Sequence, residues 1–559
     1  MINMKRHYKD LIRKRSLLTA KWTLGAALFI LHSPLLISCQ DWDDHYDGQN
    51  MSVGGEQTLW QQLSSHSELS DFCEVIQETK VFRMHKKTPV SYADLLNSGQ
   101  SFTVVAPVNG TFNKDSLLQL VQTAQGDSVV ERFFVLNHLS RSLSSIGPET
   151  KTMLLLNRKH VTLENGAIEG VTINHSNQHA KNGVLHIASR PLPYERSLYE
   201  TLTDTPSLSG IGQILRQYEE DEFDPAHSVS SGIVDGVPIY VDSMVIERNR
   251  MLQQIGLINA EDSLYWMVVP TAAGWQEAWQ ETSQYFKYDD KVLKRDSLQQ
   301  HWTARALLDD AIFNLTDQRT LVDSLVSVQY LLNRSFATAG KPVYHVYHHP
   351  FEEGGIMYGA QRVTCSNGIL FTQDRWPFTP TQAYFHELWS EAEQTQLITS
   401  DKECTYMVRR IAADSISEGG FLHIVPRTAT SNWDMTFRVN NTLSGAYDIC
   451  AIILPMTVED KNATNLRPCK LKATINYVDT TGTEKTFNCN NTQFTTDPER
   501  IDTIVLAEAF EFPACNYNQN DLKISVRLQC SILARETSRY SREMLLDCIY
   551  LRPRKKMND

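Results

Sequence analysis

The residue types best able to bind a metal gather in one stretch, "VYHVYHHPFEEGG", where His345, His348 and His349 are followed by Glu352 and Glu353. If this stretch is a strand, His345 and His349 share a face, because side chains alternate along a strand. A zinc site needs a tetrahedral set of ligands, and the sequence offers no identifiable second half. We therefore expect an aromatic and polar strand here, with no metal and no cofactor.

Motifs of known catalytic sites are missing from the sequence. It has no G-x-S-x-G elbow, H-E-x-x-H helix, Walker loop or Rossmann glycine pattern. The acidic pairs Asp309-Asp310 and Glu352-Glu353 are adjacent, whereas the two carboxylates of a glycosidase must face the substrate from opposite sides. A pair brought together from distant positions stays open from sequence alone. We predict that the chain is not an enzyme and that it has no catalytic residues.

Aromatic residues beside turns in the last 160 residues are better candidates for a site. These residues are Trp433, Tyr447, Tyr477, Tyr517 and Tyr540. An exposed ring can stack on the apolar face of a sugar, and in "TSNWDMTF" Asn432 and Asp434 flank Trp433 as hydrogen-bond partners for hydroxyl groups. We predict Trp433, Asn432 and Asp434 as ligand-binding residues. The alternative is that Trp433 anchors the core.

Cys39 is a candidate for covalent modification. A basic segment with seven Lys/Arg precedes an apolar stretch from Trp22 to Leu31, which is the order of a signal peptide. Ten apolar residues are too few for a membrane span, which needs about 20. The sequence "LISC" resembles the bacterial lipobox, which implies that residues 1–38 are removed and Cys39 is acylated, giving a lipid anchor in the membrane. An ordinary signal peptide with an incidental cysteine is the alternative.

Acidic residues follow Cys39 at once, beginning with Asp41, Asp43 and Asp44. This run resembles the surface-export tether of lipoproteins in Bacteroides-like bacteria. The resemblance implies that residues 39–56 are a flexible tether and that the protein is lipid-anchored in the outer membrane, facing the cell exterior. A merely solvated linker is the alternative.

The charge and cysteine content restrict the partners. Removal of residues 1–38 changes the formal charge from −12 to −18, which argues against nucleic acid as a partner, since a basic footprint is expected for nucleic-acid binding.

Apart from Cys39 there are nine cysteines, seven of them after residue 400. An exported chain could pair them, but the odd number and the absence of a CxxC spacing leave the pairing open.

A repeat organises the middle of the chain. The segment "TLWQQLSSHSELSDFCEVIQET" from Thr58 is echoed by "SLYETLTDTPSLSGIGQILRQY" from Ser197, and both predict an amphipathic helix after a Ser/Thr cap. "FTVVAPVNGTF" is echoed by "YWMVVPTAAGW", and "NGVLHIASRPLP" by "NGILFTQDRWPF". Three echoes in the same order predict two copies of one domain.

The two copies resemble fasciclin (FAS1) domains. The first copy has the opening helix, the "TVVAPVNGTF" block, "FFVLNHLS" where the family has a Tyr-His pair, and the closing "NGVLHIASRPLP". It keeps only the histidine, His138, which we expect to be a hydrogen-bonded core residue; in the second copy, "LLDDAIFN" has lost both members of the pair. The resemblance implies FAS1 domains at residues 57–196 and, in divergent form, 197–380, each folding independently.

The rest of the chain, residues 381–559, alternates apolar and polar residues in short segments such as "KLKATINYVDTTGTEKTFNC" and "EMLLDCIYLRP". This pattern predicts antiparallel strands, and their spacing suits a jelly-roll-like sandwich. The predicted fold class is therefore α+β: two tandem FAS1 domains followed by an all-β sandwich. The sandwich resembles carbohydrate-binding modules in architecture only.

Two functions are consistent with this organisation. The first is a non-enzymatic surface lipoprotein for adhesion or for binding glycan or matrix through its FAS1 and sandwich domains. The second is a structural accessory subunit of an outer-membrane glycan-uptake complex, which contacts a partner protein rather than sugar. The sequence names neither the ligand nor the partner.

Overall fold

The computed structural model describes residues 55–554, except 84–85, 235–236, 316–322, 330–342, 414, 490–492 and 520–522. The chain forms two compact units, one covering most of the chain up to Leu192 and one running from Pro193 onward. Among the described residues, no helix has the length and apolar character needed to cross a bilayer. The predicted signal peptide, Cys39 and the acidic run after it lie outside the described residues.

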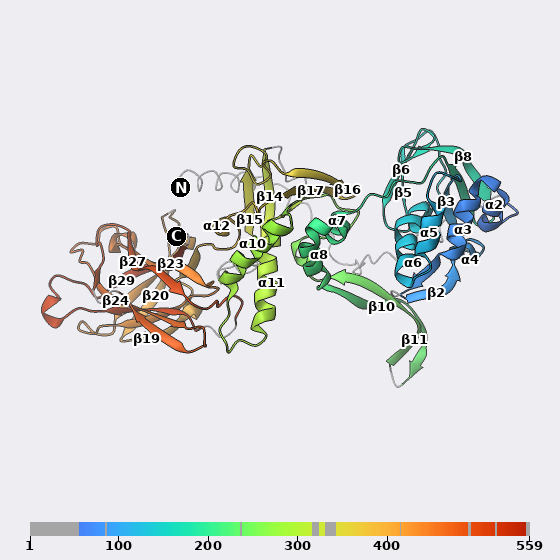
Figure 1. Cartoon of the computed structure of the whole chain (residues 1–559). Coiled ribbons are helices and arrows are strands. Elements are labelled where there is room, and N and C mark those ends of the chain that lie inside the picture. Colours follow the sequence, from blue (N-terminus) through green and yellow to red (C-terminus); the bar gives the residue numbers. More distant parts are fainter. Residues whose placement is uncertain are drawn as a thin grey trace, which may run out of the picture. The chain divides into compact units, whose positions relative to one another are not determined.

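The first unit packs short helices against one mixed sheet (Figure 1, blue to cyan). The helices are α2 (Leu59–Ser65), α3 (Ser70–Glu78), α4 (Tyr92–Leu96), α5 (Lys114–Leu120) and α6 (Ala124–Val130). The sheet has the order β4 (Leu139–Ser140), β3 (Phe102–Pro107), β9 (Gly183–Ala188), β8 (Val171–Ala180), β7 (Ala167–Ile168), β6 (His160–Glu164), β5 (Lys151–Leu154). A separate hairpin joins β1 (Lys80–Arg83) to β2 (Lys86–Ser91). Strands β3 and β9 are parallel and buried along their whole length, so they form the centre of this core.

The second copy begins the second unit. Its helices are α7 (Leu198–Asp204), α8 (Ser209–Arg216), α9 (Leu252–Ile255), α10 (Ala272–Ser283), α11 (Arg295–Leu308) and α12 (Pro380–Ala383). Its sheet has the order β13 (Ile312–Asn314), β12 (Tyr265–Pro270), β17 (Gly368–Gln373), β16 (Gln361–Cys365). Two hairpins stand apart from this sheet: β10 (Glu219–Val234) with β11 (Val237–Asn249), and β14 (Ser324–Gln329) with β15 (Val343–His348).

The repeat seen in the sequence is a repeat of structure. Strand β12 pairs in parallel with β17, in the register that β3 has with β9: Tyr265 opposite Gly368, and Phe102 opposite Gly183. A Cβ at Gly183 would lie 2.0 Å from the carbonyl oxygen of Phe102, and one at Gly368 would lie 1.8 Å from that of Tyr265. Both copies therefore require glycine at this point, because the neighbouring backbone leaves no room for a side chain.

The same asparagine fastens each copy. Asn182 Oδ1 accepts the Leu59 N–H at 2.8 Å, and its Nδ2 lies 2.8–3.2 Å from three backbone carbonyl oxygens of residues 96–100. In the second copy, Asn367 Oδ1 accepts the Leu198 N–H at 2.9 Å, and its Nδ2 donates to the carbonyls of Ile258 and Ala260. The Asn-Gly pair thus connects the first helix of each copy to the loop before its central strand. Each helix also begins with the expected cap, at Thr58 and at Ser197.

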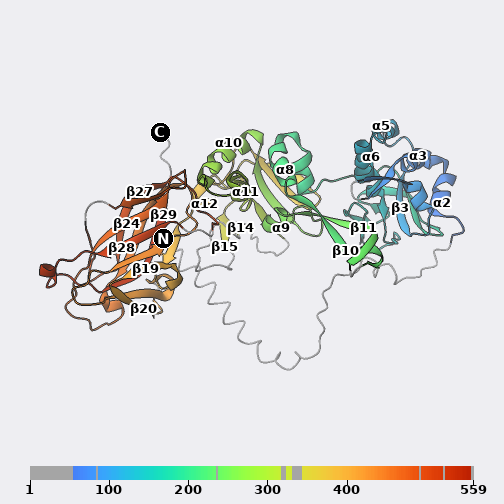
Figure 2. The ribbon, with the colours of Figure 1, turned by 90° about the horizontal axis from the view of Figure 1, so that it is seen from below.

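The C-terminal part is the predicted all-β sandwich of two antiparallel sheets (Figures 1 and 2, orange to red). The first sheet has the order β20 (Cys404–Arg410), β21 (Gly420–Pro426), β29 (Met544–Pro553), β23 (Gly445–Leu454), β27 (Asp502–Phe512), and β18 (Leu388–Glu391) also pairs with β29. The second has the order β19 (Ile398–Lys402), β22 (Asp434–Arg438), β28 (Ser525–Cys530), β24 (Lys470–Val478), β25 (Glu484–Asn488), and β26 (Phe494–Thr495) pairs with β24. None of the described strands of the sandwich joins the sheet of the second copy.

The second copy and the sandwich nevertheless share one hydrophobic core. Phe286 and Trp302 of the second copy pack on Tyr517 of the sandwich, and the Trp302 and Tyr517 ring centroids are 4.8 Å apart. Backbone hydrogen bonds join Ser444 to Tyr285 and Cys515 to Lys287. The predicted boundary near residue 381 marks a change of secondary structure within one compact unit, which contains both the second copy and the sandwich. That the parts fold independently stays a prediction.

Candidate functional site

Trp433, the strongest predicted ligand-binding residue, is a core residue. Its side chain is 0% exposed, and its Nε1–H donates to the carbonyl oxygen of Arg542 at 2.6 Å. The ring lies at the centre of the shared core because β22, which starts at the next residue, turns Met435 and Phe437 inward beside it. The expected open ring face does not exist, so the prediction of a stacking platform at Trp433 is corrected to its alternative, a core anchor.

Asn432 and Asp434 also have structural partners. Asn432 Oδ1 accepts hydrogen bonds from the Arg542 guanidinium at 3.1 Å and from the Ile532 N–H at 3.3 Å. Asp434 forms a bidentate ion pair with Arg527 and accepts a hydrogen bond from Gln529 at 3.2 Å. The Asp434 and Arg527 pair lies on the outer face of the second sheet, whereas the Trp433 ring is inside it. The structure therefore does not bring the three predicted residues together around one ligand.

The histidines of the histidine-rich stretch contact neighbouring polar side chains. Strand β15 directs His345 to Asp310, with Nδ1 and Oδ2 3.0 Å apart, while His348 contacts Ser324 at 2.9 Å. His349 lies beyond the strand and pairs with exposed Glu352 at 3.3 Å. Within the described ranges, no group of three or more His, Cys, Asp or Glu side chains is arranged to hold a metal ion.

His138 is a hydrogen-bonded core residue, as predicted. Its Nδ1–H donates to the carbonyl oxygen of Phe134 at 2.7 Å, and its Nε2 accepts the Leu192 N–H at 3.0 Å. Burial lowers the pKa of the imidazole to about 4, so the ring is neutral near pH 7. Both ring nitrogens are occupied by backbone groups, which leaves no free nitrogen for a ligand.

In the second copy, a tryptophan donates to the backbone carbonyl that is equivalent to the one His138 contacts in the first copy. Leu139 pairs with Val104 in the first copy, and Ile312 pairs with Met267 in the second. Ala311 therefore corresponds to His138, and Leu307 corresponds to Phe134. The Leu307 carbonyl accepts a hydrogen bond from Trp376 Nε1 at 3.2 Å. The loss of the histidine is thus compensated within the fold.

A stacked aromatic pair lies on the outer face of the first sandwich sheet. Trp389 on β18 and Tyr550 on β29 are direct cross-strand partners, with ring centroids 4.8 Å apart and ring planes 14° apart. Both side chains are half-buried. In the same row, Cys450 on β23 is 0% exposed, and Val505 on β27 is 41% exposed. We call Trp389, Tyr550 and Val505 the outer strip.

Charged groups border the outer strip on one side. Asp448 is 1% exposed and accepts hydrogen bonds from Arg552 at 2.7 Å and Arg554 at 2.8 Å. Burial opposes ionisation of Asp448, but the Ala509 N–H and the two guanidinium groups outweigh it and lower the pKa of this carboxyl. Arg554 also pairs with exposed Glu508 at 2.6 Å. Two partly exposed guanidinium groups, held by Asp448, therefore lie beside the outer strip.

Three buried carboxyl groups border the strip on the other side. Glu391 is 3% exposed, Glu393 is 8% exposed and Asp547 is 1% exposed. Glu391 accepts a hydrogen bond from the Ser417 hydroxyl at 2.8 Å, and Asp547 accepts the Ser417 N–H at 3.1 Å. Burial raises the pKa of both Glu391 and Asp547 to about 7. The negative charge of Glu393 adds to both shifts, and the charges of Asp547 and Glu418 add to that of Glu391.

These raised values predict a stability that depends on pH. A carboxyl whose pKa is higher in the folded protein stabilises it below the unfolded pKa of about 4 and loses that contribution as pH rises through 7. At about 1.4 kcal/mol per pKa unit, each of these two carboxyl groups accounts for roughly 3 kcal/mol between pH 5 and pH 8, so the second unit should lose several kcal/mol over this range, seen as a lower melting temperature. Glu391→Gln should flatten this dependence, whereas Glu484→Gln, at an exposed site, should not. A melting temperature that rises from pH 5 to pH 8 would contradict the assignment.

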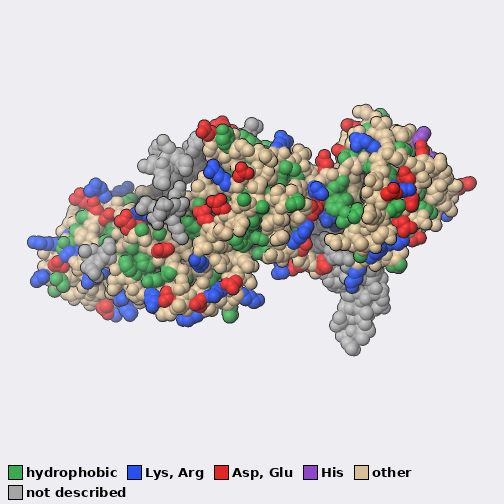
Figure 3. Space-filling model, in the orientation of Figure 1, with side chains coloured by type: hydrophobic (Ala, Val, Ile, Leu, Met, Phe, Trp, Pro, Cys, Tyr) green, Lys and Arg blue, Asp and Glu red, His purple; other side chains and the backbone are tan. Residues whose placement is uncertain are grey.

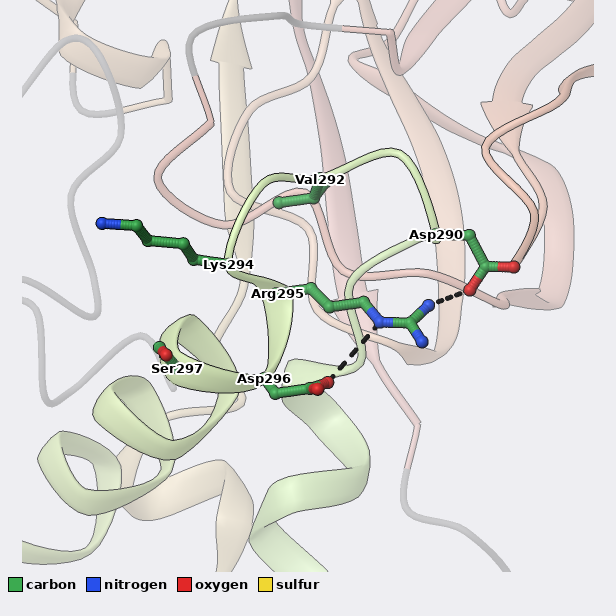
Figure 4. A pocket seen from close by; sticks show the side chains of 6 residues that line it. All are labelled: Asp290, Val292, Lys294, Arg295, Asp296 and Ser297. Atoms are coloured by element: carbon green, nitrogen blue, oxygen red, sulfur yellow. Dashed lines mark hydrogen bonds and ion pairs between the residues drawn. The ribbon is translucent and has the colours of Figure 1, made fainter.

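An open hollow at the start of α11 is lined by Asp290, Val292, Lys294, Arg295, Asp296 and Ser297 (Figure 4). Arg295 is held there by ion pairs to Asp290 and Asp296, and Lys294 extends away from them. The basic side chain inside this hollow is thus neutralised by its neighbours. On the face drawn in Figure 3, Lys/Arg and Asp/Glu side chains are interspersed, without a continuous basic patch.

Comparison with known proteins identifies one domain. Residues 77–193 match the family model described as "Fasciclin domain", so the first copy carries a FAS1 domain. No curated protein matches the sequence. The pairing of the central strands in the second copy repeats that in the first.

Fasciclin domains and carbohydrate-binding modules are among the solved structures that resemble parts of this chain. The FAS1 domain pair of the insect cell adhesion molecule Fasciclin I has 12% identity and a TM-score of 0.18, covering 56% of this chain and 98% of that chain. The CBM22-1 xylan-binding domain of Paenibacillus barcinonensis Xyn10C has 14% identity and a TM-score of 0.20, covering 30% and 93%. A family 11 carbohydrate-binding module of Clostridium thermocellum has 11% identity and a TM-score of 0.17, covering 30% and 95%.

The outer strip was missed at the level of sequence. Trp389 and Tyr550 lie in "ELWSEAEQ" and "DCIYLRP", where alternation predicts strands but does not tell which face is solvated. Of the aromatic residues singled out from the sequence, Tyr447 and Tyr517 are buried, and Tyr477 and Tyr540 are half-buried. The pairing of β18 with β29 is a long-range contact that the local pattern does not encode.

Proposed function

We propose that the protein is a non-enzymatic surface lipoprotein for adhesion or for binding of glycan or matrix, and that the outer strip contacts the ligand. The observation that carries this proposal is the partly exposed Trp389 and Tyr550 pair beside the guanidinium groups that Asp448 holds. One ring face of Trp389 stacks on Tyr550. Among the described strands, β18 pairs only with β29. The apolar face of a sugar ring can stack on an aromatic ring, while its hydroxyls accept hydrogen bonds from Arg552 and Arg554.

A glycan array with the full chain and two single variants tests this proposal. Trp389→Ala should reduce glycan binding at least tenfold while changing the melting temperature little, because the side chain is only half-buried. The control is Phe487→Ala on the edge strand β25, whose ring is 38% exposed and outside the strip; it should keep glycan binding. Equal binding by the Trp389→Ala variant, or no binding to any glycan by the unmodified chain, would remove the outer strip from consideration.

The alternative, a structural accessory of an outer-membrane uptake complex, has its own supporting observation. Phe487 of β25 and Tyr477 of β24 pack on Phe510 of β27, with ring centroids 5.1 and 5.2 Å from that of Phe510. This apolar group lies where the edge strands of the two sheets meet, and edge strands are common sites of protein contact. Cross-linking in intact cells to one partner protein, abolished by Phe487→Ala and not by Trp389→Ala, would favour this function.

Anchoring is the part of the proposal that depends on Cys39. We expect Cys39→Ala to leave the protein uncleaved or soluble in the periplasm, because several acyl chains on this residue supply the stable anchor. Membrane fractionation checks this expectation, and a variant that still fractionates with the membrane would contradict it.

Protease added to whole cells should digest the unmodified protein. Alanine at Asp41, Asp43 and Asp44 should lower that exposure while acylation persists.

A further inference from the structure

An open hollow in the first unit lies between helices α2, α3 and α4 and the hairpin of β1 and β2. Its volume is about 320 Å³, at the lower end of the range of about 300–1,000 Å³ that is typical of small-molecule sites. The side chains that border it include Trp60, Glu78, Lys80, Asp94 and Asn97. All of them belong to one compact unit, so the first copy alone forms this hollow.

Trp60 of α2 supplies the aromatic surface of the hollow. Its side chain is only partly buried and packs on the hydrophobic core of the first unit. The part of the side chain that the core does not cover borders the hollow. Because an indole ring presents an apolar surface to a ligand, it can stack on the C–H face of a sugar ring.

Two polar groups of the hollow are held in place by neighbouring side chains. Asp94 Oδ2 accepts hydrogen bonds from the Ser91 N–H at 2.9 Å and from the Ser91 hydroxyl at 2.7 Å. These bonds lower the pKa of Asp94, so its carboxylate is ionised near pH 7. Asn97 Oδ1 accepts the Thr58 hydroxyl at 2.8 Å, and its amide nitrogen therefore offers N–H donors to a ligand.

The hollow contains charges of both signs. Lys80 Nζ donates to the carbonyl oxygen of Gln77 at 3.2 Å, which occupies one of the three N–H bonds of its ammonium group. The carboxylates of Glu78 and Asp94 border the same hollow. A cationic ligand would meet the ammonium group, and an anionic ligand would meet two carboxylates. A sugar hydroxyl both donates and accepts hydrogen bonds, so this mixed set of donors and acceptors fits a neutral sugar.

The second copy differs from the first at this place. In the gapless alignment of the two opening segments, Trp60 corresponds to Tyr199 and Lys80 corresponds to Glu219. The Tyr199 hydroxyl donates a hydrogen bond directly to the Glu219 carboxylate. The aromatic and charged side chains that meet in the second copy are thus replaced, in the first copy, by two residues that border a hollow.

We propose that this hollow binds one neutral sugar unit, whose ring stacks on Trp60. The hydroxyl groups of the sugar then form hydrogen bonds with Lys80, Asp94 and Asn97. The inference deepens the proposed function, on which it rests for the role of a glycan as ligand. It assigns a second glycan contact to the first copy, in a different compact unit from the outer strip.

Saturation-transfer NMR of the full chain tests the proposal in solution, where weak binding of a single sugar is measurable. The probes are the methyl glycosides of glucose, galactose and mannose, with glucosamine and glucuronate as charged comparators. The chain carries Trp389→Ala, so that the outer strip does not contribute. We expect a signal from at least one neutral glycoside and weaker signals from both charged sugars.

Adding Trp60→Ala to this chain should lower the signal of the neutral glycoside by roughly fivefold or more, because the stacking surface is lost. The matched control is Tyr199→Phe, at the corresponding position of the second copy, which should keep the signal. A signal that survives Trp60→Ala, no signal from any neutral glycoside, or a stronger signal from a charged sugar would overturn the proposal.

Two charge variants provide a second test, which decides if Trp60→Ala does not fold. Lys80 is partly exposed and Glu78 is exposed, so Lys80→Met and Glu78→Gln should keep the melting temperature. Relative to the neutral glycoside, Lys80→Met should raise the glucosamine signal roughly twofold, and Glu78→Gln should raise the glucuronate signal by a similar factor, because each removes a like charge. Unchanged relative signals in both variants would contradict the site.

The result is independent of the test of the outer strip. All samples in the NMR experiment carry Trp389→Ala, so a negative result leaves the glycan-array comparison at Trp389 as it is. Conversely, a glycan array that shows no role for Trp389 leaves the effect of Trp60→Ala to be decided by NMR.

Discussion

Replacing Trp433 with alanine should destabilise the second unit by about 3–5 kcal/mol, the range measured for removing a large aromatic side chain from a core. The ring is fully buried among residues of both sandwich sheets. Its removal leaves a cavity and also deprives the Arg542 carbonyl of the Trp433 Nε1–H donor. A buried carbonyl without a donor adds to the loss.

Thermal or urea unfolding of the variant measures this effect. The matched control is Trp389→Ala on the same sandwich, since a half-buried ring should cost much less stability than a fully buried one. The two variants should therefore separate: Trp433→Ala lowers stability, and Trp389→Ala lowers glycan binding. An unchanged melting temperature for Trp433→Ala would show that the ring is not part of the core.

Replacing Asn182 with alanine should destabilise the first unit by roughly 3 kcal/mol. The side chain satisfies the Leu59 N–H and carbonyls of residues 96–100. Buried groups left without partners cost about 1–3 kcal/mol each, and water that enters the vacated space should offset part of this loss. Alanine cannot replace either the donor or the acceptor.

Asn367→Ala is the counterpart in the second copy, where it removes the Leu198 contact and two carbonyl contacts. Differential scanning calorimetry of the full chain should show two transitions, one for each compact unit. Asn182→Ala should lower only one of them and Asn367→Ala only the other. If either variant lowered both transitions equally, the two units would not unfold independently.

The order of the elements and the repeat could be predicted from local patterns in the sequence. The Ser/Thr caps and apolar spacing that predict the first helix of each copy are local, and both helices are capped as expected at Thr58 and Ser197. Alternation likewise predicted the hairpin around Gly482, which adopts a φ of +71° there. The apolar setting of His138 was enough to predict a core histidine. These features depend on residues close in the chain, so short-range patterns record them.

Only the tertiary structure decided where a surface for binding could lie. Whether Trp433 is buried depends on how β22 pairs with β28, and the stacking of Trp389 on Tyr550 depends on β18 pairing with β29. A shift of one residue in such a pairing moves every side chain to the other face of the sheet. The merging of the second copy with the sandwich likewise joins distant segments. Local alternation fixes that a segment is a strand, but the partners that bury one of its faces are set by packing across the whole core.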